Sequence, residues 1–130
     1  MAAPARSPLI LIVDDNAESR AMYATYLKAA GFRVEEAGHG FQGIEKAFKL
    51  SPDIILMDLL MPALDGWETI RLLKGRLRTR AIPIIALTGD TREEDLRLAR
   101  NAGCDQLLLK PCLPEVVCTQ VRRLLHLANV

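Results

Sequence analysis

Five polar side chains stand out because each lies at or just after the end of an apolar run: Asp14, Asp15, Asp58, Thr88 and Lys110. Three are carboxylates, and two carboxylates ~4 Å apart repel by about 4 kcal/mol at an effective dielectric near 20. A packed acidic cluster therefore needs protons or a cation to persist. Oxygen ligands favour Mg²⁺, which keeps several waters and often bridges to phosphate. If the fold brings these acids together, we expect them to bind Mg²⁺.

The remaining two groups extend this chemistry to a phosphoryl group. Lys110 offers a compact positive charge to one phosphoryl oxygen, and the Thr88 hydroxyl can donate a hydrogen bond to another. A carboxylate beside a hard cation can act as a nucleophile and become an acyl phosphate. Taken singly, each residue has an ordinary explanation, and Asp14 or Asp15 can simply cap the first helix. The combination at the ends of four strands is what predicts phosphoryl chemistry.

Residues 53–67 position Asp58. Ile54–Met57 form a short continuous apolar run, which is typical of a strand buried on both faces of a sheet. Pro62 and the pair Asp65–Gly66 follow, so we expect a turn and a helix that starts near Gly66. A carboxylate at the carboxyl end of a buried strand lies where open α/β sheets bind their ligands.

Apolar runs and helical periodicities alternate along the whole chain. The expected strands are 9–13, 32–37, 54–57, 82–87 and 106–109, and the expected helices are 16–30, 42–50, 66–73, 91–102 and one from residue 114. Five alternations with short connections predict an α/β fold, a doubly wound parallel sheet with helices on both faces. In a parallel sheet all carboxyl ends share one edge, so the five polar groups are expected to converge.

Three local signals mark helix ends and faces. Gly31 is typical of a helix C-terminus, and Thr91–Glu94 has the form of a capping box. Phe41, Ile44, Ala47 and Phe48 recur at helical spacing and predict the inner face of the second helix.

Composition limits the possible classes of protein. The chain has 130 residues, enough for one domain, with half of them hydrophobic and a formal net charge of +1. We expect no nucleic-acid partner and no membrane partner, because neither a basic excess nor a membrane-spanning run is present. We expect the basic segment Lys74–Arg80 to be a solvated helix end and loop and not a binding patch. Cys104, Cys112 and Cys118 predict neither a disulfide framework nor a zinc site, which favours a cytoplasmic location.

From about Leu9 to Leu127 the chain resembles a response-regulator receiver domain of two-component signalling, of the chemotaxis single-domain type. The motifs that carry the resemblance are Asp14–Asp15, Met57–Asp58, Met61–Pro62, Asp65–Gly66, Thr88–Gly89 and Lys110–Pro111. The resemblance implies the flavodoxin-like strand order 2-1-3-4-5 with five helices. From their Ala and Pro content we expect residues 1–8 to form a flexible N-terminal tail, and residues 128–130 are the C-terminal end.

The resemblance also implies roles for the polar residues. Asp58 is the expected phosphoacceptor, and the donor is a phosphohistidine on a sensor histidine kinase or a histidine phosphotransfer protein. Thr88 and Lys110 hold phosphoryl oxygens, and the Lys110–Pro111 peptide bond is cis. Such domains hydrolyse their own acyl phosphate but do not turn over external substrates.

For Mg²⁺, the implied ligands are Asp15, Asp58 and the backbone carbonyl of Leu60, while Asp14 holds a metal-bound water. Leu60 departs from the polar residue that many members have two positions after the acceptor, beside the route of the hydrolytic water. We therefore expect a long-lived acyl phosphate, unless Asp90 orients water instead. A second departure is Leu107, where the family usually has the Tyr or Phe that turns inward on activation.

Three functions are compatible with this sequence. The favoured one is a phosphorylation switch that alters binding to an unknown downstream protein. A phosphatase of the haloacid dehalogenase type needs a second acid at the position of Leu60. A docking module that is never phosphorylated is expected to lack one of the acids or the lysine. The chain is read as a stand-alone receiver or one excised from a larger protein, and the last helix, with Val116, either packs only on the sheet or supports a homodimer.

Overall fold

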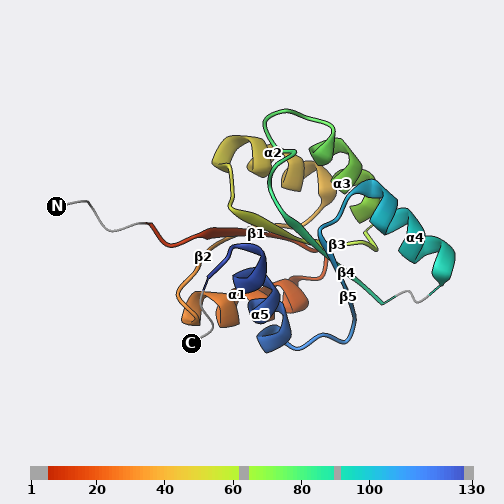
Figure 1. Ribbon diagram of the computed structural model, residues 1–130. Helices are drawn as coiled ribbons and strands as arrows, with labels where there is room; N and C mark the ends of the chain where they lie inside the picture. Colours follow the sequence, from red (N-terminus) through yellow and green to blue (C-terminus); the bar gives the residue numbers. More distant parts are fainter. Residues whose placement is uncertain (1–5, 62–64, 90–91, 128–130) are drawn as a thin grey trace.

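The computed structural model describes residues 6–61, 65–89 and 92–127 of the chain. Figure 1 shows a central sheet between two layers of helices. The elements are β1 Leu9–Val13, α1 Ala17–Ala29, β2 Arg33–Ala37, α2 Gly40–Leu50, β3 Ile54–Asp58, α3 Gly66–Lys74, β4 Ile84–Thr88, α4 Glu93–Ala102, β5 Gln106–Leu109 and α5 Pro114–Leu124. The predicted alternation of strands and helices is confirmed.

All five strands are parallel, in the order β2-β1-β3-β4-β5. Every residue of β1, β3 and β4 is buried, whereas β2 and β5 at the edges are more exposed. This explains why the central strands are continuous apolar runs, since both of their faces are covered by helices. The predicted fold class and strand order are confirmed.

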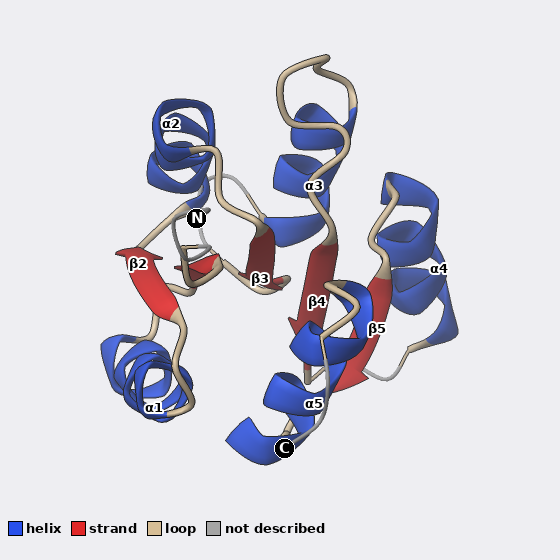
Figure 2. Ribbon diagram, turned by 60° about the vertical axis from the view of Figure 1, so that its left-hand side comes forward, coloured by secondary structure: helices blue, strands red, loops and turns tan. Residues whose placement is uncertain are grey.

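The sheet divides the apolar core into two halves. On one face, α1 and α5 pack with side chains such as Ile10, Leu27 and Val117. On the other face, α2, α3 and α4 pack with side chains such as Met57 and Ile70. Figure 2 shows these two layers of helices on opposite sides of the strands. The strand ends between the two layers are therefore held from both faces.

The residue that caps the amino end of α1 is not one of the two acids considered in the sequence. Asn16 is its N-cap, because the Asn16 side chain accepts a hydrogen bond from the Ser19 amide at 2.9 Å. The expectation that Asp14 or Asp15 caps this helix is wrong. The Asp14 carboxylate instead accepts from the Asn16 amide at 2.9 Å, in a turn that precedes the helix. At the other end, Gly31 has a φ of 101°, which is the left-handed conformation expected after a helix.

Two further helix predictions need correction. The N-cap of α4 is Arg92, which makes no side-chain capping bond, so the helix begins one residue later than the proposed capping box requires. Thr91 itself lies outside the described residues. In α2, Ala47 is buried as expected, but Phe41 is 62% exposed. The helix begins at Gly40, and its buried residues are Gly40, Gly43 and Ala47, so Phe41 lies off the face that packs on the sheet.

Candidate functional site

Four strands deliver polar side chains to the carboxyl edge of the sheet. Asp14 and Asp15 follow β1, Asp58 ends β3, Thr88 ends β4 and Lys110 follows β5. One carboxylate oxygen from each of the three acids lies within 4.8 Å of the others. The Lys110 Nζ lies 3.4 Å from Asp58 Oδ1, and the Lys110 amide donates to the Thr88 carbonyl at 2.8 Å. The structure thus brings the five residues singled out in the sequence to one edge of the sheet, and the three acids and Lys110 form one polar pocket there.

Asp58 is buried at the centre of this pocket. Burial raises its pKa from the ordinary value of 3.8 to about 6; Lys110 opposes this rise, and Asp14 adds to it. The Leu60 amide also donates to Asp58 Oδ1 at 3.2 Å, which favours the ionised form. The Lys110 ammonium and the Leu60 amide therefore stabilise the ionised Asp58 less than its burial beside other acids destabilises it. A bound cation would supply the missing positive charge.

The donor set fits Mg²⁺. Its members are carboxylate oxygens on the ends of two adjacent strands, β1 and β3, with one acid, Asp15, exposed and two buried. A hard divalent cation that keeps several waters suits a site that supplies few protein ligands and opens to solvent on one side.

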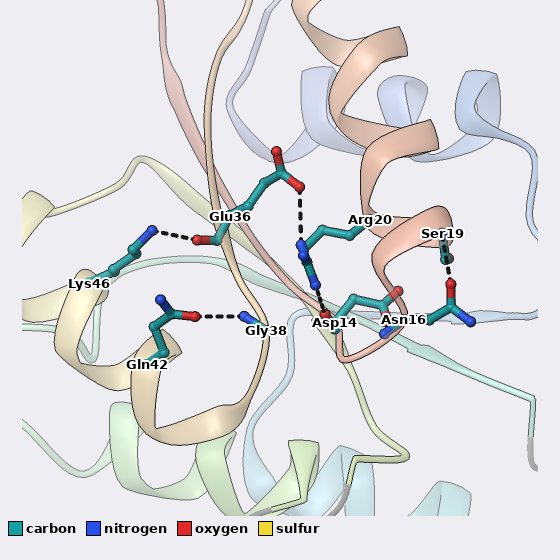
Figure 3. Close-up of polar contacts among 8 residues, drawn as sticks. All are labelled: Asp14, Asn16, Ser19, Arg20, Glu36, Gly38, Gln42 and Lys46. Atoms are coloured by element: carbon teal, nitrogen blue, oxygen red, sulfur yellow. Dashed lines mark hydrogen bonds and ion pairs between the residues drawn. The ribbon is translucent and has the colours of Figure 1, made fainter.

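The acid pair after β1 is anchored by Arg20 of α1. The Arg20 Nη1 donates to the Asp14 carbonyl at 2.7 Å, and its Nε pairs with Glu36 Oε1 at 3.0 Å (Figure 3). The Asp14 amide donates to the Ala37 carbonyl of β2 at 3.1 Å. The backbone of Asp14 is therefore held between α1 and β2. Sequence reasoning missed Arg20, because a basic residue on an amphipathic helix reads as solvent-facing.

The other end of this network is also fixed. Lys46 of α2 donates to the Glu36 carbonyl, and the Gln42 side chain accepts from the Gly38 amide at 2.8 Å, as Figure 3 shows. Glu36 is thus held in place on β2 by α2. Because Glu36 in turn orients the guanidinium, α2 contributes indirectly to the position of the Asp14 backbone.

Gly66 meets the backbone at the end of β3. A β-carbon at position 66 would collide with the Asp58 carbonyl oxygen and lie 2.5 Å from the Leu59 Cα. The Gly66 amide donates to the Leu59 carbonyl at 3.1 Å, and Asp65 caps α3 by accepting from the Glu68 amide at 2.9 Å. The pair Asp65–Gly66, recognised in the sequence as a turn, therefore also packs α3 against the end of β3.

Tyr23 of α1 makes a second contact that sequence reasoning missed. Its hydroxyl donates to the Cys112 carbonyl at 2.7 Å, just beyond the Lys110–Pro111 peptide bond. That bond is cis, as predicted. In the sequence Tyr23 counts only as one apolar residue of a helical repeat, which gives no signal for a polar partner far along the chain.

The two positions that depart from the family pattern lie in different environments. Leu60, two residues after Asp58, is 59% exposed. Leu107 is half-buried and packs on the core half that contains α3 and α4. A cavity of about 70 Å³ beside the end of β3 is lined by Leu59, Leu60, Trp67, Thr88, Arg92 and Asp95. Pro62 and Asp90, which also figured in the sequence analysis, lie outside the described residues.

Comparison with protein families agrees with this geometry. The model of the response regulator receiver domain matches residues 10–122 of the chain. The transcriptional regulatory protein ResD of Bacillus subtilis is 36% identical over 92% of the chain, but the match covers 49% of ResD. The chain thus spans about half the length of this curated relative.

Solved structures give the same result. The chemotaxis protein CheY4 of Vibrio cholerae matches with a TM-score of 0.84 and 31% identity, over 90% of this chain and 98% of that one. The receiver domain of the sensor histidine kinase PA1611 of Pseudomonas aeruginosa matches with a TM-score of 0.86 and 30% identity, over 92% and 98%. The PA1611 structure holds a magnesium ion in its active-site cleft.

Proposed function

Because this chain belongs to the response-regulator receiver family, we propose that it is a phosphorylation switch in which Asp58 accepts a phosphoryl group from a phosphohistidine. The observation that carries the proposal is the position of Asp58, buried among two further acids with Lys110 Nζ 3.4 Å from its carboxylate. The family fold is typical of signalling switches and not of turnover enzymes. The proposed receiver domain spans residues 9–127.

In the proposed reaction, an Asp58 carboxylate oxygen attacks the phosphorus atom. The bond between phosphorus and the donor histidine nitrogen breaks as the bond between phosphorus and oxygen forms, and the nitrogen keeps the electron pair and takes up a proton. Lys110 offsets negative charge on one phosphoryl oxygen, and the Thr88 hydroxyl donates to another. Such a transfer depends mainly on positioning and charge neutralisation.

Mg²⁺ would be held by Asp15, Asp58 and the Leu60 carbonyl, with Asp14 holding a metal-bound water. When bound, it supplies the positive charge that the phosphoryl oxygens and the clustered acids require. The support for this assignment is the group of carboxylate oxygens within 4.8 Å and the magnesium ion in the cleft of the PA1611 receiver.

A groove between α1 and the start of α5 offers a place for the phosphodonor. It has a volume of about 600 Å³, and its lining includes Ser19, Met22, Tyr23, Lys110, Pro111 and Leu113. The phosphoryl group on the donor histidine must come within bonding distance of Asp58. Lys110 lines this groove, and its Nζ also lies 3.4 Å from Asp58 Oδ1, so the groove borders the pocket. We therefore expect the histidine kinase or phosphotransfer protein to bind across the groove.

The output of the switch depends on the whole protein. The relative ResD is a transcriptional regulatory protein, so the expectation of no nucleic-acid partner gains no support from it. None of the helices in the described part of the chain has the length and apolar character that crossing a bilayer requires. We propose that phosphorylation of Asp58 changes the binding of a downstream partner, through this domain or through a segment joined to it.

The test is to incubate the protein with Mg²⁺ and acetyl phosphate and to measure its intact mass. We expect the gain of one phosphoryl group in the wild type and none in Asp58→Asn. Asp53→Asn is the matched control, because Asp53 binds the Leu9 amide at the amino edge of the sheet and must leave labelling unchanged. Rapid turnover of phosphate esters would instead favour the phosphatase, and no labelling with any donor would favour the docking module.

A further inference from the structure

We propose that Tyr23 is a positioning residue for Lys110: its hydroxyl tethers α1 to the segment that carries this lysine. The proposal rests on the proposed function, since it concerns how efficiently the pocket accepts the phosphoryl group. It assigns a role in the reaction to a residue of the first helix that touches none of the reacting atoms.

The tether joins parts of the chain that are far apart in sequence. Tyr23 is 2% exposed, and its ring packs in the core half formed by α1 and α5. Its hydroxyl donates to the Cys112 carbonyl at 2.7 Å, across 89 residues of sequence. A buried hydroxyl requires a partner, because an unsatisfied one is costly to desolvate. The ring therefore serves packing, while the hydroxyl specifically fixes the Cys112 carbonyl.

Two hydrogen bonds hold the backbone around Lys110, one at Lys110 itself and one at Cys112. Its amide donates to the Thr88 carbonyl at 2.8 Å, which continues the pairing of β5 with β4. Two residues later, the Tyr23 hydroxyl holds the chain against α1. Strand β5 has no fully buried residue, so it anchors Lys110 less firmly than a central strand would. The tether therefore restricts the segment from which the Lys110 side chain reaches Asp58.

The protonation state of Tyr23 agrees with this role. Burial raises its pKa to about 12, with further contributions from Cys112, Asp14 and Asp58. The phenol therefore stays protonated and keeps donating at physiological pH.

The chain offers a matched control in Thr79. Its hydroxyl is fully buried and donates to the Leu73 carbonyl at 2.6 Å, in the segment that leads into the amino end of β4. Tyr23→Phe and Thr79→Val each remove one buried hydroxyl donor and keep the shape of the side chain. The two hydrogen bonds lie at opposite edges of the sheet, so only Tyr23→Phe should affect the pocket.

The experiment measures the rate of phosphorylation by acetyl phosphate, and the affinity for Mg²⁺ by calorimetry, in the wild type and both variants. We expect Tyr23→Phe to lower the rate roughly threefold to tenfold and Thr79→Val to leave it unchanged. The Mg²⁺ affinity should stay the same, because Lys110 is not a metal ligand. In a Lys110→Ala background, Tyr23→Phe should have no further effect, since residues that act through one another are not additive.

Each outcome decides the matter. If the wild type is labelled on Asp58 and Tyr23→Phe reacts as fast as Thr79→Val, the positioning role is wrong and the proposed function stands. A loss of rate that persists undiminished in the Lys110→Ala background also overturns the role, because Tyr23 then acts by another route. A wild type that takes up no phosphoryl group overturns the proposed function, and this inference with it.

Discussion

Gly66 lies against the carbonyl of Asp58 so closely that no β-carbon fits between them. Helix α3 begins at this glycine, so its first turn is packed on the last residue of β3. The closeness of the two backbones determines where the Asp58 carboxylate lies relative to the helix. A side chain at position 66 can be accommodated only by moving one of the two elements.

We therefore predict that Gly66→Ala lowers the free energy of unfolding by about 1–3 kcal/mol, as overpacking does elsewhere. It should also reduce phosphorylation, because the end of β3 must shift. Gly89→Ala is the control: it is next to Thr88, and its β-carbon would meet only the Lys110 Cβ at an ordinary 4.0 Å. Urea unfolding of both variants checks the prediction, and equal stabilities would contradict it.

The pKa of Asp58 predicts a pH-dependent stability in the absence of metal. Burial raises this pKa from 3.8 to about 6, so ionising Asp58 opposes folding as the pH rises through this window. At pH 7.5 in a chelator, Asp58→Asn should be more stable than the wild type by on the order of 2 kcal/mol. Near pH 4 and below, where Asp58 is protonated in the folded state, the gain should shrink toward zero.

Urea unfolding at several pH values measures this difference, with Asp53→Asn as a control that should show no such gain. Mg²⁺ at pH 7.5 should stabilise the wild type more than Asp58→Asn, because a ligand that binds only the folded state raises its stability. A gain for Asp58→Asn that is the same at pH 4 and pH 7.5 would show that burial of the charge is not its cause.

Arg20 predicts an effect on metal affinity from a residue that is not a ligand. Arg20→Ala removes the hydrogen bond to the Asp14 carbonyl and the pair with Glu36. We expect the Mg²⁺ affinity to fall roughly tenfold, as for other residues that orient metal ligands. Calorimetry measures it, and Arg33→Ala serves as the control, since Arg33 binds the Ser7 carbonyl. An unchanged Mg²⁺ affinity in Arg20→Ala would show that Arg20 does not orient the metal ligands.

Leu60 bears on the lifetime of the acyl phosphate. Because Leu60 is largely exposed beside Asp58, Leu60→Asn should fold normally and can orient a water near the acceptor. We expect dephosphorylation to become several-fold faster, measured by the decay of the phosphorylated mass after the donor is removed. Leu77→Asn replaces a leucine that is 80% exposed at the other edge of the sheet and should not change the decay. If the two variants decay alike, the expectation of a long-lived phosphate is wrong.

The sheet was predictable because its signals are local. The apolar run that starts at Ile54 and the five alternations of strand and helix require only neighbouring residues to be read, and they determine which strand ends share an edge. Even the edge strand Gln106–Leu109 is observed with the predicted limits. The gathering of polar groups then follows from topology, because parallel strands place their carboxyl ends together.

The contacts that hold the site were not predictable in the same way. Asp14, Asp15 and Asn16 can all cap a helix, and only the path of the chain after Val13 selects Asn16. The partner of Tyr23 lies 89 residues away, and a helical repeat carries no information about it. Hydrogen bonds of this kind depend on the packing of α1 against α5, which exists only once the fold has formed.

The uneven burial of the strands has a consequence for the dynamics of the pocket. Central strands should open to hydrogen exchange only on near-global unfolding, whereas an edge strand exchanges through smaller fluctuations. The three acids and the threonine follow or end the protected strands β1, β3 and β4, while Lys110 follows the outermost strand β5. We therefore expect the backbone that carries the acids to exchange more slowly than the segment that carries Lys110, which makes the hydrogen bond from Tyr23 the main restraint on the lysine side of the pocket.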